Sequence, residues 1–177
     1  MKGILFTGSG VAIVTPFHAG AVNFPAFGRL IDRQIDGGTD AIIVCGTTGE
    51  ASTMSYHERM RTVEFCVEHV NGRVPVIAGS GSNATENAMT LSRDAERAGA
   101  DGLLLVTPYY NKANKSGMLA HFQAVADAVS QAGYDPYAKK ILGLTEMQKL
   151  LGKKKFDELL GGLIEKPGQA RPCAIVR

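Results

Sequence analysis

The sequence predicts an α/β protein built around a parallel sheet, and three features of its pattern support this class. Short apolar runs rich in β-branched residues recur along the first two thirds of the chain. They are nearly continuous rather than alternating, as expected for strands that are covered on both faces. Their centres lie about thirty residues apart, the length of one strand and one crossover helix. Signals for the start and end of a helix fall between them.

Four strands are expected, and a helix follows each of them. Asn23, ahead of Pro25, begins the first helix. Ser55 and Glu58 form an S-x-x-E capping box that begins the second helix. The strands correspond to the apolar runs Val11–Thr15, Ala41–Cys45, Val74–Ala78 and Leu103–Thr107.

The third and fourth helices complete a regular alternation of strands and helices. Asn83 or Thr85 can cap the third helix, which ends at Gly99. The fourth helix begins at Ser116 and reaches about Val129. Either a doubly wound sheet or half of an eight-stranded (β/α)8 barrel fits this order, since four units cannot close such a barrel. In both architectures functional residues follow the C-terminal ends of the strands.

Composition and charge divide the chain into two parts. The chain has 177 residues, of which 45% are hydrophobic, as in ordinary globular domains. Residues 1–138 carry ten Lys/Arg and thirteen Asp/Glu, whereas residues 139–177 carry nine and four. Such a change of sign near one point indicates a boundary. We expect an α/β domain over residues 1–129 and an unrelated basic helical tail over residues 130–177.

Several classes of protein are disfavoured by the sequence. No apolar run approaches the ~18 residues that a membrane span needs. The first residues lack the apolar stretch of a secretion signal, so we expect a cytoplasmic protein. Cys45, Cys66 and Cys173 are widely spaced, with no CxxC pair or Cys/His cluster. No metal site, cofactor or disulfide framework is therefore expected.

The segment after the second predicted strand is the main candidate site. It reads Gly46-Thr47-Thr48-Gly49-Glu50. Glycines let the backbone approach a ligand closely, and free amides with two hydroxyls would form a small receptor for a carboxylate or phosphate. A purely structural turn is the alternative interpretation. The segment lacks the Walker lysine and the dinucleotide-binding glycine spacing, which disfavours nucleotide binding.

Two other loops follow predicted strands. Tyr109 and Tyr110 come after the fourth strand, where adjacent tyrosines can relay protons or stack on a ligand, although rim packing is their more usual role. Residues Gly79–Asn83 after the third strand form another close-approach loop, with a helix cap as the alternative interpretation. These loops would surround the candidate site in a parallel sheet.

Four motifs in order and at matching spacing resemble one known family. They are S-G-V-A-I-V-T-P-F near the start, G-T-T-G-E, V-P-V-I-A-G-S-G and V-T-P-Y-Y-N. Over about residues 3–129 the chain resembles the dihydrodipicolinate synthase (4-hydroxy-tetrahydrodipicolinate synthase) family of pyruvate-dependent aldolases. The sister family, N-acetylneuraminate lyase, usually has serine at the position of Thr47, so the synthase is the closer match. A fragment of an N-acetylneuraminate lyase-like aldolase is the alternative within the family.

The resemblance implies a lyase of lysine and diaminopimelate biosynthesis. Members of the family are (β/α)8 barrels, usually tetramers of paired dimers. They condense pyruvate with aspartate semialdehyde through a Schiff base. The expected fold is accordingly a partial TIM (β/α)8 barrel with the first four βα units, followed by a short helical C-terminal tail.

The resemblance also assigns roles by position. Thr48 is similar to the residue that binds the pyruvate carboxylate, with Gly46 beside it. Thr47 is similar to the middle of a proton relay. Tyr110 is similar to the relay tyrosine that reaches into the active site of the neighbouring subunit, and Ala12 would line the pocket floor. These roles agree with a carboxylate receptor that also handles protons.

A second, regulatory site is implied only in part. Ser52, Asn83 and Tyr109 lie at positions that resemble the lysine-feedback site of the family. Tyr56 and Arg59 stand where two histidines are often found there. The predicted feedback site is therefore incomplete.

The Schiff-base chemistry of the family uses a lysine on the sixth strand, and no match to it is found. Strands five to eight are not expected in this chain. A lysine must be desolvated to act as a nucleophile at neutral pH, and the tail lysines lie in polar or helical contexts. We therefore expect the chain to hold a small 2-oxo acid such as pyruvate but to be inactive alone. The tail lysines are Lys139, Lys140, Lys149, Lys153, Lys154, Lys155 and Lys166.

The tail supports a second functional hypothesis. Residues 134–168 resemble the C-terminal end of an uncharacterised phage-associated family. Lys153-Lys154-Lys155 could contact nucleic acid or a protein partner and make the chain a binding module. A single charge cluster is more often a solvated face, which disfavours nucleic acid. Half a barrel would also leave unpaired strand edges, so self-association through these edges is expected.

Overall fold

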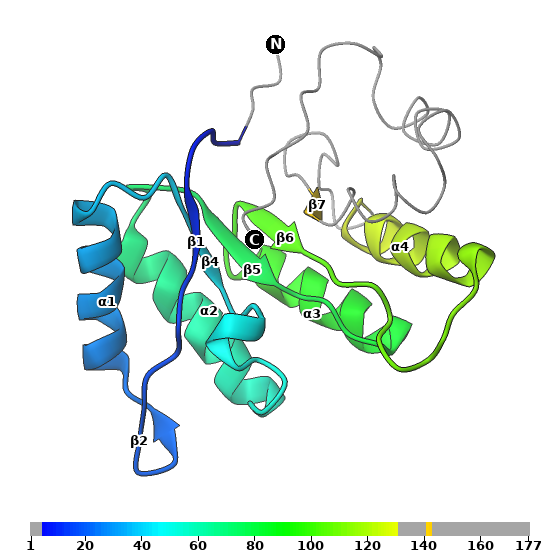
Figure 1. The fold of residues 1–177 in the computed structure, drawn as a ribbon, viewed down its shortest axis with the longest axis horizontal. Helices are drawn as coiled ribbons and strands as arrows, with labels where there is room; N and C mark the ends of the chain where they lie inside the picture. The colour runs from blue at the N-terminus through cyan, green and yellow to red at the C-terminus, as the bar shows by residue number, and fades with distance from the viewer. Residues whose placement is uncertain (1–4, 131–140, 143–177) are drawn as a thin grey trace.

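The structure is a computed structural model that describes residues 5–130 and 141–142. Strands and helices alternate along most of this part of the chain (Figure 1). In chain order the elements are β1 (Gly10–Ala12), β2 (Phe17–His18), β3 (Ala21–Val22), α1 (Phe24–Asp36), β4 (Ala41–Val44), η1 (Thr47–Gly49), α2 (Tyr56–Val70), β5 (Val76–Gly79), α3 (Thr85–Arg97), β6 (Gly102–Leu104), α4 (Lys115–Ser130) and β7 (Ile141–Leu142).

The main sheet is parallel and is wound in one direction. Its strand order is β1-β4-β5-β6-β7, which follows the chain without reversal. Right-handed crossovers between successive neighbours place every helix on the same face of the sheet. Figure 1 shows α1, α2, α3 and α4 following one another along it, each packed against the next. A doubly wound sheet would reverse its order and carry helices on both faces, so the described residues form part of a barrel wall.

Four of the strands are those expected from the apolar runs, each shorter than its run. The prediction that no fifth strand appears is wrong. β7 pairs in parallel with β6, placing Ile141 opposite Leu103 and Leu142 opposite Leu104. An unpaired strand edge offers free N–H and C=O groups to any extended segment within reach. The edge expected to stay open at β6 is therefore covered over two residues.

A small antiparallel ribbon precedes α1 and was not expected from the sequence. β2 pairs with β3 so that Phe17 lies opposite Val22. The two-residue turn between them has positive φ angles at Ala19 and Gly20 (50° and 80°), the backbone conformation that a tight hairpin requires. The ribbon forms a separate two-stranded sheet, set apart from the main sheet in Figure 1.

The first two helices begin as their sequence signals predict. The Asn23 side chain accepts a hydrogen bond from the Ala26 amide. The Glu58 carboxylate accepts from the Ser55 amide at 3.0 Å, and the Ser55 hydroxyl accepts from the Glu58 amide at 3.3 Å. These two bonds complete the predicted capping box.

The third and fourth helices begin differently from prediction. Neither Asn83 nor Thr85 caps α3, since Ala84 holds the cap position without a side-chain bond and Thr85 is the first helical residue. α4 begins at Lys115 rather than Ser116. A hydrogen bond from the Gly117 amide to the Asn114 side chain at 2.8 Å supports its first turn. The loop path, rather than the presence of a capping side chain, places Ala84 at the cap position of α3.

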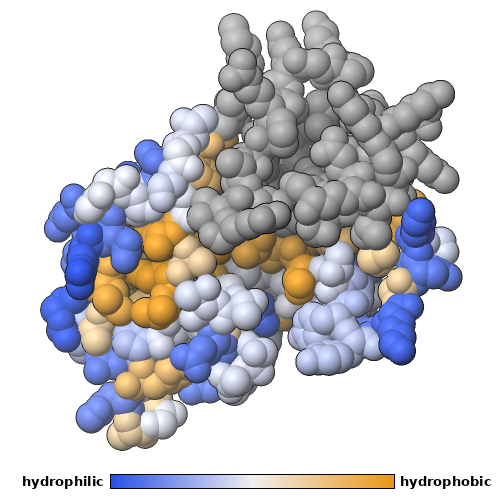
Figure 2. Space-filling model, viewed as in Figure 1, coloured by the Kyte–Doolittle hydropathy of each residue, from blue (hydrophilic) through white to orange (hydrophobic). Residues whose placement is uncertain are grey.

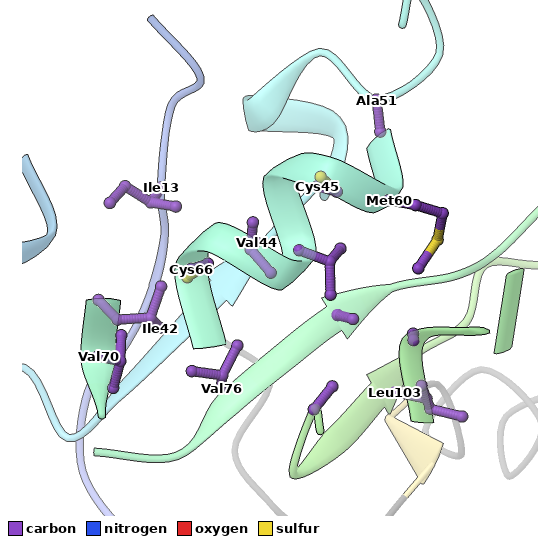
Figure 3. Packing of buried hydrophobic residues seen from close by; sticks show 14 of the residues in the cluster. Ile13, Ile42, Val44, Cys45, Ala51, Met60, Cys66, Val70, Val76 and Leu103 are labelled. Atoms are coloured by element: carbon purple, nitrogen blue, oxygen red, sulfur yellow. The ribbon is translucent and has the colours of Figure 1, made fainter. Parts of the chain in front are cut away.

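The hydrophobic core lies between the sheet and its helices. Figure 3 shows Cys66 and Val70 of α2 beside Ile42 of β4 and Val76 of β5. Burying one side chain of this size contributes about 1.5–3 kcal/mol. The largest fully buried side chains are Phe27, Ile31, Ile42, Ile77, Val44, Val63, Val70, Val76, Val125, Val129, Thr62 and Cys45. The core thus fixes the strand ends that carry the candidate site.

A buried histidine joins α3 to α4. His121 is 3% exposed, and its Nδ1 lies 2.9 Å from the Thr85 hydroxyl. Its Nε2 is buried, with no hydrogen-bond partner within the described residues. Burial lowers the pKa of His121 from the ordinary value of 6.5, because the apolar interface disfavours the charged ring.

We predict that acid destabilises the chain through His121. In the unfolded chain the ring takes up a proton as the pH falls below about 6.5, whereas the folded chain resists protonation. The free energy of unfolding should be highest above this pH and decline below it, until the folded ring is itself protonated. Urea denaturation between about pH 5 and 8 measures this slope.

The variant His121→Asn should be less stable at neutral pH and should lose most of the slope. His57→Asn, at an exposed position of α2, is the matched control and should keep the profile of the unsubstituted chain. Equal slopes in all three proteins would show that His121 is not responsible.

Candidate functional site

The turn after β4 presents the two candidate threonines to solvent. The chain leaves the strand at Cys45, which has a φ of 54°, and continues into the short helix η1. Within it, the Gly49 amide donates to the Gly46 carbonyl at 3.1 Å. Thr47 and Thr48 are both exposed, whereas Gly49 is buried. Both threonines therefore lie exposed after the C-terminal end of β4.

A buried threonine from the first strand's end anchors this turn. Thr15 is 4% exposed, and its hydroxyl donates to the Gly49 carbonyl at 2.8 Å. A Cβ on Gly49 would lie 3.1 Å from the Ile13 carbonyl oxygen and 3.2 Å from the Thr15 Oγ1. The sequence placed Thr15 in a strand without a functional role. Its signal, a hydroxyl inside an apolar run, is too common to identify an anchor.

Arg59 contacts residues at the ends of β4 and β5. Its guanidinium donates to the Gly79 carbonyl at 2.6 Å, with a longer contact of 3.4 Å to the Gly81 carbonyl. Burial lowers the pKa of the Arg59 guanidinium. The Arg59 carbonyl lies 3.7 Å from the Cys45 thiol, which donates to it. Sequence reasoning noted Arg59 only as a replacement in the feedback site and missed these contacts.

Cys45 is not suited to act as a nucleophile. Its side chain is buried, and burial raises the pKa of its thiol to about 12. The reactive form of cysteine is the thiolate, which such an environment disfavours. Figure 3 shows Cys45 within the core beside α2. Cys45 therefore acts in packing.

Apolar side chains lie exposed near the candidate site. Ala12 is exposed at the end of β1, consistent in position with the predicted pocket floor. Val14 and Val106 are 49% and 44% exposed, although both belong to predicted strands. Figure 2 shows apolar surface gathered on the face toward the viewer, where the strands run in Figure 1. The described residues thus leave part of this face uncovered.

The loop after β6 projects an aromatic ring. Tyr110 is 94% exposed and has a φ of 65°, which is uncommon for a bulky residue. Its ring centre lies 5.9 Å from that of Tyr109, edge to face. Asn111 ties the loop down by donating to the Asn83 carbonyl at 2.7 Å. The structure does not bring the Tyr110 hydroxyl into a hydrogen bond with Thr47 within the described residues.

The predicted regulatory positions are only partly assembled. Ser52 and Tyr109 are exposed, and the Asn83 backbone is occupied by its bond to Asn111. The Tyr56 hydroxyl donates to the Asp94 carboxylate at 2.5 Å, which raises the pKa of Tyr56. Tyr56 and Arg59, which stand in place of the two histidines, therefore both make hydrogen bonds within the chain.

The described residues contain neither a metal-binding cluster nor a membrane-spanning helix. Residues 5–130 and 141–142 contain no group of three His, Cys, Asp or Glu side chains placed to hold a metal ion. None of the helices in this part of the chain is long and apolar enough to cross a bilayer. The predicted tail helices and tail lysines lie outside the described residues. The division at residues 129 and 130 stays a prediction.

The described fold is part of the wall of an aldolase-type (β/α)8 barrel, with two exposed threonines after the C-terminal end of β4. The model of the "Dihydrodipicolinate synthetase family" matches residues 5–147. The chain belongs to this family, which confirms the resemblance noted from the motifs.

This chain matches less than two thirds of the length of each of the following relatives. The 4-hydroxy-tetrahydrodipicolinate synthase of Pelobacter propionicus is 58% identical over 125 residues, covering 71% of this chain and 43% of the relative. The Clostridium novyi synthase is 44% identical over 171 residues, covering 91% and 58%. Dihydrodipicolinate synthase from Acinetobacter baumannii, complexed with pyruvate, is 44% identical with a TM-score of 0.68, covering 70% and 43%. The chain thus spans about half the length of these relatives.

We predict that Gly79→Ala strongly disturbs the site. A Cβ there would lie 2.1 Å from the Cys45 carbonyl oxygen and 2.7 Å from its carbon. Because both are backbone atoms, the strands must separate, at a cost of about 1–3 kcal/mol or more. Urea denaturation measures the loss.

Gly46→Ala is the matched control within the same pair of strand ends. Its Cβ would meet Leu104 at an ordinary 3.9 Å, and its φ of −76° suits alanine. The control should stay within about 0.5 kcal/mol of the unsubstituted chain. Similar stability of both variants would show that the close contact is not as tight as described.

Proposed function

We propose that this chain carries the carboxylate-binding half of a 4-hydroxy-tetrahydrodipicolinate synthase site and holds pyruvate or a similar 2-oxo acid. The observation that supports this most directly is the exposed pair Thr47 and Thr48 at the end of β4. Hydroxyl and amide donors suit a carboxylate, and charge-assisted hydrogen bonds of this kind are among the stronger ones. The pyruvate complex of the Acinetobacter baumannii relative is consistent with such a ligand.

The roles of individual residues follow from their positions. Thr48, with Gly46 beside it, binds the carboxylate, and Ala12 forms part of the pocket floor. Thr47 passes a proton between the bound acid and the hydroxyl of Tyr110. Since Tyr110 points into solvent, its partner threonine belongs to another copy of the chain, as the family resemblance implies.

The nucleophilic half of the chemistry is not supported by the described residues. Within residues 5–130 the lysines are Lys112 and Lys115, both exposed near the start of α4. A Schiff-base lysine needs desolvation, which exposed positions do not provide. We therefore propose that the 177-residue chain binds a 2-oxo acid without forming a covalent adduct, and that it does not condense pyruvate with aspartate semialdehyde alone.

We predict that pyruvate binding depends on the Thr48 hydroxyl. Thr48→Val keeps the shape of the side chain and removes one hydrogen bond to a charged ligand. Such bonds contribute about 1.5–3 kcal/mol, so the dissociation constant should rise roughly tenfold or more. Titration of the labelled chain with pyruvate, followed by NMR, measures the affinity.

Two controls accompany this titration. Thr90→Val, at an exposed position of α3, should bind pyruvate like the unsubstituted chain. Borohydride treatment with pyruvate should leave the intact mass unchanged. Equal affinity of Thr48→Val and the unsubstituted chain would refute the carboxylate role, and a stoichiometric adduct would refute the absence of a Schiff base.

We also propose self-association at the uncovered end of the sheet. β1 is an edge strand within the described residues, and Val14 at its end is half exposed. The projecting Tyr110 ring offers a further contact. Exposed aromatic and apolar groups of this kind are typical of protein interfaces.

We predict that the chain sediments as a dimer or larger species at micromolar concentration. Val14→Lys should shift it toward the monomer, because a charge at the edge opposes strand pairing. Phe17→Lys, 40% exposed in the separate β2–β3 ribbon, is the control and should leave association unchanged. A monomer with a sharp, high-temperature melt would contradict the proposal.

A further inference from the structure

We infer that Arg59 is a positioning residue for the carboxylate receptor formed by Gly46, Thr47 and Thr48. It acts through its contacts with Gly79 and Cys45, which fix the backbone that leads into this receptor. The inference rests on the proposed function, since it concerns the same receptor. Arg59 is not itself a ligand of the proposed bound acid. It acts through the strand ends that carry the receptor.

The contacts form a closed triangle. The Arg59 guanidinium donates to the Gly79 carbonyl at 2.6 Å and so fixes the end of β5. Gly79 in turn lies against the Cys45–Gly46 peptide, where an added Cβ would come within 2.1 Å of the Cys45 carbonyl oxygen and 3.0 Å of the Gly46 nitrogen. The Cys45 thiol completes the triangle by donating to the Arg59 carbonyl at 3.7 Å.

The triangle encloses an unfavourable backbone conformation. Cys45 is fully buried and has a φ of 54°, in the left-handed region that residues with a Cβ rarely adopt. Such a conformation persists only where the surroundings impose it. Here Cys45 is held by the close approach of the Gly79 backbone and by the hydrogen bond from its thiol to the Arg59 carbonyl. The direction in which the chain leaves Cys45 sets where Gly46 and the two threonines lie.

A lysine or an apolar residue would not reproduce these contacts fully. The planar guanidinium reaches two carbonyls of one strand end, those of Gly79 and Gly81, at 2.6 and 3.4 Å. An ammonium group is a compact point charge and lacks this fixed fork. Among the described residues the Arg59 guanidinium makes no ion pair with a carboxylate, and its Nε has no hydrogen-bond partner. The hydrogen bonds of the guanidinium are therefore to backbone carbonyls at the end of β5.

A merely structural role would predict a different outcome. If Arg59 only joined α2 to the sheet, its removal would lower stability and leave the receptor unchanged in the molecules that remain folded. If it positions the receptor, the Cys45 backbone and the amides of residues 46–49 should change in the folded protein. The two roles are separable by NMR of the native state.

The experiment compares Arg59→Met, Arg59→Lys and the control Arg61→Met in the 177-residue chain. Arg61 lies two residues away on α2 and is exposed, with a weak 3.9 Å contact to Glu64. Thermal melts report stability. The coupling between the Cys45 amide and Hα protons reports its φ, and the amide shifts of residues 46–49 report the receptor.

Arg59→Met should shift the Cys45 coupling and the amides of residues 46–49, and should weaken pyruvate binding roughly tenfold, as expected for displaced receptor groups. Arg59→Lys should restore part of each change, and Arg61→Met should cause none. If Arg59→Met does not fold, Arg59→Lys must still show partial changes in the coupling and amides at native temperature. Unchanged coupling and amide shifts in the folded Arg59 variants would overturn the inference.

The pyruvate titration separates this inference from the proposed function. Receptor amides that respond to Arg59→Met in a chain that does not bind pyruvate would support the positioning role and refute the proposed ligand. Pyruvate binding that is equal in Arg59→Met and the unsubstituted chain would support the ligand and refute the positioning role.

Discussion

The close approach of β4 and β5 at their C-terminal ends is the constraint on which the candidate site depends. Gly79 brings the backbone of one strand against the carbonyl of Cys45 in the other, at a separation that leaves no room for a Cβ. Cys45 is held in a left-handed conformation beside this contact, and the chain turns sharply out of the core. The turn ends with two threonines facing solvent and a buried glycine held by Thr15. A small change at the strand ends would therefore move the whole candidate site.

The winding of the sheet determines what surrounds the receptor. Because the strands follow the chain order and the helices cover one face, the opposite face is closed in a complete barrel by further strands. Within the described residues that face keeps exposed valines at the ends of the first and fourth predicted strands. On the proposed function, binding and covalent chemistry therefore belong to different parts of the barrel. A carboxylate receptor can form from local turn geometry, whereas a nucleophilic amine needs the desolvated interior that a closed barrel supplies.

Much of the fold could be predicted because its signals are local. Apolar runs and the Ser55–Glu58 box each depend on a few consecutive residues, and the structure confirms the corresponding strands and helix start. Predictions failed where several neighbouring residues were equally suited to cap a helix, or where a strand depends on pairing with a strand far away in the sequence. The start of α3 had two polar candidates and used neither. β7 consists of two residues and exists through its pairing with β6, which no periodicity within so short a segment can indicate.

The amino-acid sequence by itself determined the family, the alternation of strands and helices, and the position of Thr47 and Thr48 after a strand. These features follow from residue type and spacing along the chain. Only the tertiary structure decided that the sheet is wound in one direction, that Thr15 anchors the turn, and that Arg59 connects α2 to the end of β5. The physical reason is that each of these depends on groups twenty or more residues apart, whose meeting is set by packing rather than by local preference.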